Sequence, residues 1–248
     1  MRGRVAALCL SAALGAVAAG QAPLDQALRI VVIDVEGGEA TLFVSPTGES
    51  MLVDAGWSGF GGRDAERIVA AAREAGVRQI DHLVTTHYHA DHAGGVAELA
   101  ARLPIRHFVD HGDTVGDDER TWHAGYTAIR GAARRTVATP GAVIPITGLD
   151  VRVLAASGAV LRQPIAGRGV ANPFCAGFVP QGPEITSRAA DAGDGHSVSL
   201  FVALGRFETV IMGDLNWNKE FELMCPTNPV GQVDLYLVSH HGSDTSGS

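Results

Sequence analysis

The segment 85–95, Thr-Thr-His-Tyr-His-Ala-Asp-His-Ala-Gly-Gly, constrains this chain more than any other. Within six residues it holds four side chains that can bind a metal, which are His87, His89, Asp91 and His92. Imidazoles and a carboxylate packed this closely must be solvated, protonated or metallated. The mainly apolar segment 80–84 precedes them and the apolar periodicity of 96–103 follows, which predicts a strand, a ligand loop and a helix. A loop that binds one or two cations such as zinc is the interpretation we favour, and a solvated histidine-rich loop is the alternative.

The pattern His-x-His-x-Asp-His after a strand resembles the signature of the metallo-β-lactamase superfamily, and the resemblance extends from about residue 30 to the end of the chain. It implies an α/β fold, the αββα sandwich, with two packed sheets, helices outside, and ligand-bearing loops at one edge. Sequence patterns predict helices over 64–75, 96–103 and 117–135. They predict strands over 30–35, 40–44, 50–53, 105–109, 143–146, 149–154, 198–204, 208–212 and 235–238.

The same resemblance extends the site beyond the loop. Asp214, which follows an apolar strand, looks like the carboxylate that bridges two metals in the family. Ser-His-His-Gly-Ser at 239–243 looks like the family's final ligand. We favour His240 as that ligand, because it is nearer the strand, with His241 as a proton-transfer or substrate residue. Asp54, at the end of another strand, is expected to support the site by hydrogen bonding to a ligand, although it could be a simple turn residue.

The third ligand of the first metal is open between Asp191, Asp194 and His196, and His196 is the obvious donor type. The predicted metal ligands are therefore His87, His89, Asp91, His92, His196, Asp214 and His240. The predicted catalytic residues are Asp91 and His241. The expected cofactor is zinc, two ions per chain, with manganese or iron as alternatives because nitrogen and oxygen donors accept all three.

The resemblance implies a hydrolase that directs a metal-bound hydroxide at an ester-like bond of the phosphodiester or lactone class. The alternatives are a β-lactamase and a non-hydrolytic metal-binding protein of the same fold. An aspartate at the bridging position, where several β-lactamases carry cysteine, favours the first. The segments 33–38, 53–56, 213–214 and 240–243 look like the hydrolase domain attached to the DNA-uptake channel of competent bacteria. Without that channel's membrane helices, the chain is expected to be a free-standing, exported relative.

Residues 1–22 predict a secretory signal peptide, because Arg2 and Arg4 precede an uncharged, Ala-rich apolar run that closes with small residues. An uncleaved anchor is the alternative. Residues 23–248 are then one hydrolase domain with an irregular insertion at about 156–194, and we expect the sandwich to be truncated at its C-terminus. A periplasmic or secreted location follows, with no membrane attachment after the signal is removed.

The formal net charge is −8, which makes long nucleic acid an unlikely partner because such binding depends on Lys and Arg. A small molecule or short phosphodiester is the expected substrate. Cys175 and Cys225, which lie outside the signal peptide, could form a disulfide in an oxidising compartment. The sequence leaves the oligomeric state open.

Overall fold

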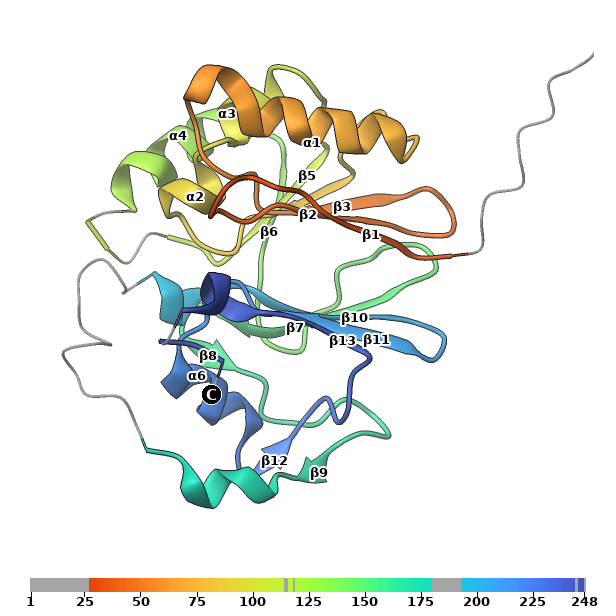
Figure 1. Ribbon diagram of the computed structural model, residues 1–248, viewed down its shortest axis with the longest axis vertical. Coiled ribbons are helices and arrows are strands. Elements are labelled where there is room, and N and C mark those ends of the chain that lie inside the picture. Colours follow the sequence, from red (N-terminus) through yellow and green to blue (C-terminus); the bar gives the residue numbers. More distant parts are fainter. Residues whose placement is uncertain (1–26, 114–115, 118, 180–192, 244, 248) are drawn as a thin grey trace, which may run out of the picture.

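The computed structural model describes residues 27–113, 116–117, 119–179, 193–243 and 245–247. Two β-sheets pack face to face, and helices cover the outer side of each (Figure 1). The predicted αββα sandwich is therefore confirmed. The predicted signal peptide falls outside the described residues.

The first sheet has six strands in chain order: β1 (Arg29–Val32), β2 (Thr41–Val44), β3 (Ser50–Val53), β4 (His82–Val84), β5 (His107–Asp110) and β6 (Arg134–Val137). The β1–β3 pairs are antiparallel, and β3 to β6 run parallel. Helices α1 (Arg63–Glu74), α3 (Val96–Ala100) and α4 (Arg120–Arg130) lie on its outer face (Figure 1). The apolar residues that predicted the first helix, such as Ile68 and Ala72, are fully buried against that face.

The second sheet has the order β13-β11-β10-β7-β8, with bounds β7 (Asp150–Ala156), β8 (Ala159–Val160), β10 (Ser199–Leu204), β11 (Phe207–Ile211) and β13 (Leu235–Leu237). Helix α6 (Trp217–Met224) packs outside it. A small ladder joins β9 (Val170–Ala171) to β12 (Thr227–Asn228). Between the two large sheets, buried side chains such as Val53, Val84, Val153 and Leu200 form the central core.

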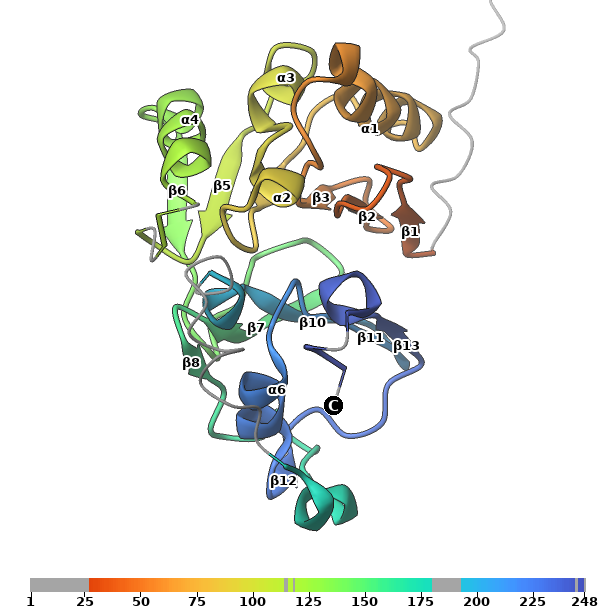
Figure 2. The same ribbon diagram turned by 60° about the vertical axis from the view of Figure 1, so that its left-hand side comes forward.

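Parallel strands determine where the loops gather. The segments that follow β3, β4 and β5 leave the first sheet at one edge, because the carboxyl ends of parallel strands coincide. The loop after β4 contains a short helix, α2 (Ala90–Ala93), and Figure 2 shows it facing the second half of the molecule. The predicted ligands His87, His89, Asp91 and His92 come from this edge.

Several predicted elements differ from the structure. Helix α4 ends at Arg130 because Gly131 takes a positive φ of 49°, and β6 begins within the range predicted as helix. Residues 143–146 form only a bridge between Val143 and Arg152. Helix α6 was not predicted, although Asn216 caps it by accepting a hydrogen bond from Lys219 N.

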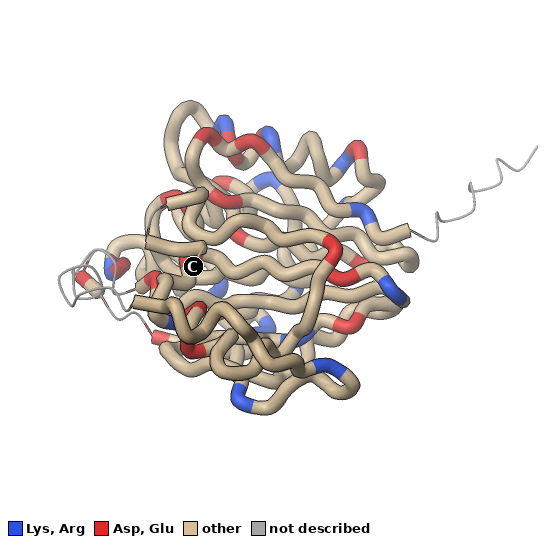
Figure 3. The backbone as a smooth tube through the Cα atoms, turned by 60° about the horizontal axis from the view of Figure 1, so that its bottom comes forward, with Lys and Arg blue, Asp and Glu red and all other residues tan. Residues whose placement is uncertain are grey.

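The insertion predicted at 156–194 contains β8, β9 and the 3-10 helix η2 (Pro173–Gly177), while residues 180–192 lie outside the described part. Cys175 of η2 and Cys225, which follows α6, form a disulfide, a pairing that the sequence left open. Acidic and basic positions are interspersed along the described backbone (Figure 3). Within that part of the chain, no helix has the length and apolar character needed to cross a bilayer.

Candidate metal centre

The ligand loop leaves β4 in an extended conformation and then turns into α2. His87 is fully buried and His89 is partly exposed, and their rings meet edge to face with centroids 4.3 Å apart. The turn of α2 then directs Asp91 and His92 towards a second position. The spacing of the motif thus directs its four donors to two positions as two pairs.

The first pair is completed from the second half of the chain. Asp194, in the 3-10 helix η4 (Asp194–His196) before β10, lies with His87 and His89 in one group of potential ligands. Its Oδ1 is 3.6 Å from His87 Nε2 and 3.3 Å from His89 Nδ1. The carboxylate is 2% exposed, so it faces the histidines rather than solvent.

The second pair is completed by His241, in the 3-10 turn η5 (Ser239–Gly242). His241 Nε2 lies 3.3 Å from Asp91 Oδ2 and 3.2 Å from His92 Nε2. Two imidazole nitrogens this close need a proton or a cation between them, because two lone pairs repel.

Asp214 lies between the two groups. Its Oδ2 is 3.9 Å from His87 Nε2, 3.2 Å from His92 Nε2 and 3.4 Å from His241 Nε2. His87, His92 and Asp214 themselves form a third group of potential ligands. A carboxylate in this position has the geometry needed to touch a cation in either neighbouring group.

These distances fit a divalent metal. Zinc binds nitrogen and oxygen at about 2.0–2.2 Å in tetrahedral geometry, which places neighbouring donors roughly 3.3 Å apart. The donor separations in the second group, 3.2–3.7 Å, agree with that spacing. In addition, the buried Nε2 of His87 has no hydrogen-bond partner among the residues that the structure describes. A buried nitrogen with an unused lone pair is costly unless a ligand meets it.

The pKa values of the histidines in the cluster are shifted in opposite directions. Burial and the nearby His92 ring lower the pKa of His87 well below its usual value. Burial opposes protonation of His92 as well, but the carboxylates of Asp214 and Asp54 outweigh it and raise the pKa of His92 well above normal. Hydrogen bonds to Asp214 and then Asp91 raise the pKa of His241 to about 9.

Asp214 is a carboxylate whose pKa these histidines lower. Burial would raise its pKa, yet His92 and the hydrogen bond from His241 hold the pKa well below the usual range. Asp91 behaves similarly, since its hydrogen bond with His241 outweighs burial and lowers its pKa. Without a metal, protons therefore provide the positive charge that the two carboxylates attract, and a metal would compete with those protons.

Asp54 supports this arrangement from behind, as predicted. Its fully buried carboxylate accepts hydrogen bonds from Thr86 N at 2.8 Å and Thr86 Oγ1 at 2.6 Å, and lies 2.8 Å from His92 Nδ1. The residue has a positive φ of 59°, a strained conformation that Asp tolerates better than most residues. Strain of this kind is common where a functional side chain must be aimed.

The last histidine pair departs from the expectation that His240 is the ligand. His241 joins the second group, whereas His240 Nε2 is 3.6 Å from Asp214 and its Nδ1 is 3.0 Å from Thr245 Oγ1. The reason is the backbone: both histidines have positive φ, 47° and 53°, so the turn curls and the second ring reaches the site.

His196 also departs from the expectation. It is in none of the ligand groups found among the described residues. Its ring lies instead beside His111, with centroids 6.0 Å apart, and over the backbone of Gly158. The 3-10 turn of η4 directs Asp194 towards the histidines, so of the three candidates Asp194 is the one in the group. Asp191 lies outside the described residues.

One further carboxylate near the first group was not predicted. Glu119, directly before α4, is fully buried and accepts a hydrogen bond from Tyr88 N, in the middle of the His-x-His pair, at 3.0 Å. It also packs closely against Gly193, which precedes Asp194. Nothing in the local sequence around Glu119 marks it, because its role depends on contacts with distant segments.

Comparisons with known proteins identify the family that this chain resembles. Residues 33–154 match the family model described as the Metallo-beta-lactamase superfamily. Recombination protein 2 of Haemophilus influenzae is 25% identical over 221 residues, which is 89% of this chain but only 22% of that protein's length. The chain therefore spans about a fifth of this curated relative.

The fold of this chain is similar to those of several solved structures. Metallo-beta-lactamase SMB-1, bound to 2-mercaptoethanesulfonate, has a TM-score of 0.50 and 14% identity, covering 86% of this chain and 76% of that one. A metallo-beta-lactamase of Cronobacter sakazakii has a TM-score of 0.48 and 16% identity, covering 86% and 75%.

Proposed function

Because this chain carries a metallo-β-lactamase superfamily domain, we propose that it is a metal-dependent hydrolase of an ester-like bond, phosphodiester or lactone. The observation that supports this most is the pair of three-donor groups joined by Asp214. A structural metal site needs only one closed set of ligands, whereas two adjacent groups with a shared carboxylate suit a catalytic pair.

In this proposal His87, His89 and Asp194 hold the first metal. Asp91, His92 and His241 would hold the second, and Asp214, which lies between the two groups, would contribute to both. The donors are imidazole nitrogens and carboxylate oxygens, which suit zinc and also accept manganese or iron. Metals bound there would lower the pKa of coordinated water and stabilise negative charge that develops on the substrate.

The side chains around the metals have their own roles in the proposal. Asp54 fixes the ring of His92 through Nδ1 and leaves Nε2 facing the second group. His240, which lies near both Asp214 and Asp194, replaces His241 as our candidate for hydrogen bonding to substrate or transferring a proton. Its partial exposure, 22% of the side chain, leaves it accessible from solvent.

The charge of the chain supports the proposed substrate class. A net charge of −8 and interspersed acidic and basic positions suit a small ester or short phosphodiester better than long nucleic acid (Figure 3).

We propose export to the periplasm or medium, because the N-terminal sequence suggests a signal peptide and the Cys175–Cys225 disulfide suits an oxidising compartment.

The test is metal content and turnover of the purified protein. We expect about two metals per chain and hydrolysis of bis(p-nitrophenyl) phosphate or a simple lactone that a chelator abolishes and zinc restores. Asp214→Ala should lose turnover, whereas Asp150→Asn, on an exposed carboxylate that pairs with Arg152, should match the wild type. Hydrolysis of nitrocefin alone would indicate a β-lactamase. Metal binding without any turnover would indicate a binding protein, and either result would refute the proposal.

A further inference from the structure

The turn that carries His240 and His241 cannot hold its own conformation. Both residues have positive φ, 47° and 53°, in the left-handed region that is strained for non-glycine residues. Such a conformation persists only where surrounding contacts fix it. The described residues around η5 should therefore include the group that does so.

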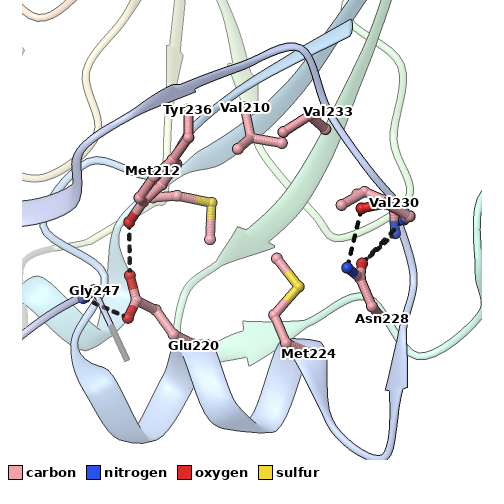
Figure 4. A pocket seen from close by; sticks show the side chains of 10 residues that line it. Val210, Met212, Glu220, Met224, Asn228, Val230, Val233, Tyr236 and Gly247 are labelled. Atoms are coloured by element: carbon pink, nitrogen blue, oxygen red, sulfur yellow. Dashed lines mark hydrogen bonds between the residues drawn. The ribbon is translucent and has the colours of Figure 1, made fainter. Parts of the chain in front are cut away.

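The carboxylate of Glu220, in the middle of α6, contacts this turn and is the candidate for that group. The side chain is buried, with 5% of the residue exposed. One oxygen accepts a hydrogen bond from the hydroxyl of Ser239, the first residue of η5, and lies 3.4 Å from Tyr236 Oη. The other oxygen accepts from Gly247 N at 2.7 Å. Figure 4 shows Glu220 rising from α6 towards Tyr236 on one side and Gly247 on the other.

The contacts of Glu220 enclose the turn from both ends. Tyr236 belongs to β13, which leads into η5, and its hydroxyl also contacts Ser239 Oγ. Gly247 belongs to the segment that leaves η5 and folds back over the start of α6, where Trp217 N donates to Thr245 O at 2.8 Å. Thr245 Oγ1 in turn lies 3.0 Å from His240 Nδ1. One buried carboxylate thus ties the strand before the turn to the segment after it.

The turn is also coupled to the bridging aspartate. His240 N donates to Gly213 O at 3.0 Å, and Gly213 precedes Asp214. Gly213 itself packs so closely on Thr86 that a Cβ would lie 2.9 Å from Thr86 Cβ, so this backbone has little freedom to follow a moving turn. A shift of η5 would therefore move His241 relative to Asp214.

The apolar surroundings of Glu220 strengthen its hydrogen bonds. A cavity of about 240 Å³ lies beside the carboxylate, lined mostly by apolar side chains such as Met212, Met224 and Val230 (Figure 4). Hydrogen bonds to a carboxylate are stronger in apolar surroundings.

We propose that Glu220 is a positioning residue that sets the conformation of the 239–242 turn and, through His241, the affinity of the second metal group. It touches neither metal nor substrate. The part that concerns the metal rests on the function proposed above, whereas the conformation of the turn does not depend on it.

The experiment compares Glu220→Ala and Glu220→Gln with Glu222→Gln in the full chain. Glu222 is the matched control, because it lies on the same helix but pairs with Lys219 and Arg162 at the surface. Hydrogen exchange of the segment 236–243 is measured without metal, and cobalt(II) is then titrated while its visible absorption is followed. We expect Glu220→Ala to speed exchange at least tenfold and to weaken one of two cobalt-binding steps at least tenfold, with Glu220→Gln intermediate and Glu222→Gln unchanged.

Unchanged exchange in Glu220→Ala would overturn the proposal, as would equal weakening of both cobalt steps. If the wild-type chain binds no metal, the proposed function fails, while the exchange measurement still decides the role of Glu220 in the turn. Ser239→Ala and Tyr236→Phe remove single partners of the carboxylate and replace Glu220→Ala if that variant does not fold. Faster exchange at 236–243 in Ser239→Ala is then the supporting result, and wild-type exchange in both variants is the overturning one.

Discussion

Asp54→Asn separates a supporting role from a role in folding more cleanly than any other change. The Asp54 carboxylate can only accept hydrogen bonds, and it lies 2.8 Å from His92 Nδ1 and 2.6 Å from Thr86 Oγ1. It therefore keeps a proton on Nδ1 of His92 and leaves Nε2 as the atom that faces Asp91 and His241. Asparagine has almost the same shape and tolerates the positive φ at this position, so the backbone is expected to stay in place.

The amide cannot satisfy the same partners. If its NH2 faces His92, the imidazole proton is driven onto Nε2, the atom needed for metal binding. If its NH2 faces Thr86 N, two donors meet in a fully buried site. The second arrangement costs about 1–3 kcal/mol, the penalty for a buried donor without an acceptor. Losing such a supporting hydrogen bond typically lowers metal affinity 10–100-fold. We expect that loss in the second metal-binding step alone.

Zinc competition against a chromophoric chelator gives the two affinities, and urea unfolding of the metal-free protein gives the stability change. Asp34→Asn is the control, since the Asp34 side chain is 77% exposed and pairs with Arg67 at the surface. Wild-type affinity at both steps in Asp54→Asn would refute the tautomer argument. A large, equal loss at both steps would refute its restriction to the second group.

Three further predictions concern protons and the disulfide. The pKa of His241 in the metal-free protein is about 9, above its usual 6.5, so a metal that binds below pH 9 must displace a proton from it. Loss of that proton should raise the affinity for the second metal by up to tenfold per pH unit to about pH 9, in addition to the contribution of His92, whose pKa is also raised. A flat profile in metal titrations from pH 7 to 9 would contradict this. Burial, together with the nearby His82 and Arg134, lowers the pKa of His107 to about 4. The unfolded chain therefore binds more protons than the folded protein between pH 4 and 6.5. The free energy of unfolding should fall by on the order of 1 kcal/mol as pH drops through that window. Urea unfolding of His107→Gln should show a shallower fall, and an identical pH dependence would exclude His107 as the cause. The free energy of unfolding of the Cys175→Ser/Cys225→Ser double variant should be about 2–4 kcal/mol lower than that of the wild type, because the disulfide closes a loop with a sequence separation of 50. An unchanged urea midpoint would show that other contacts already constrain this loop.

The sequence determined the parts of this protein that depend on local spacing. The His-x-His-x-Asp-His loop places its donors by the extended and helical geometry of six successive residues, so their division into two pairs could be predicted. Apolar periodicity located α1 and most strands of the two sheets for the same reason. The sequence also identified Asp54 and Asp214 as candidates, because each directly follows an apolar strand.

Tertiary structure decided the positions of those side chains that depend on contacts between distant segments of the chain. His241 rather than His240 reaches the second group because two consecutive residues adopt positive φ, and a contact with α6 holds them there. Asp194 rather than His196 joins the first group because a 3-10 turn rotates one side chain inwards. Glu119 and Glu220 carried no local signal, since their partners lie on other elements of the fold. Local spacing determines which donors the chain has, whereas hydrogen bonds and packing between distant segments determine which of those donors converge.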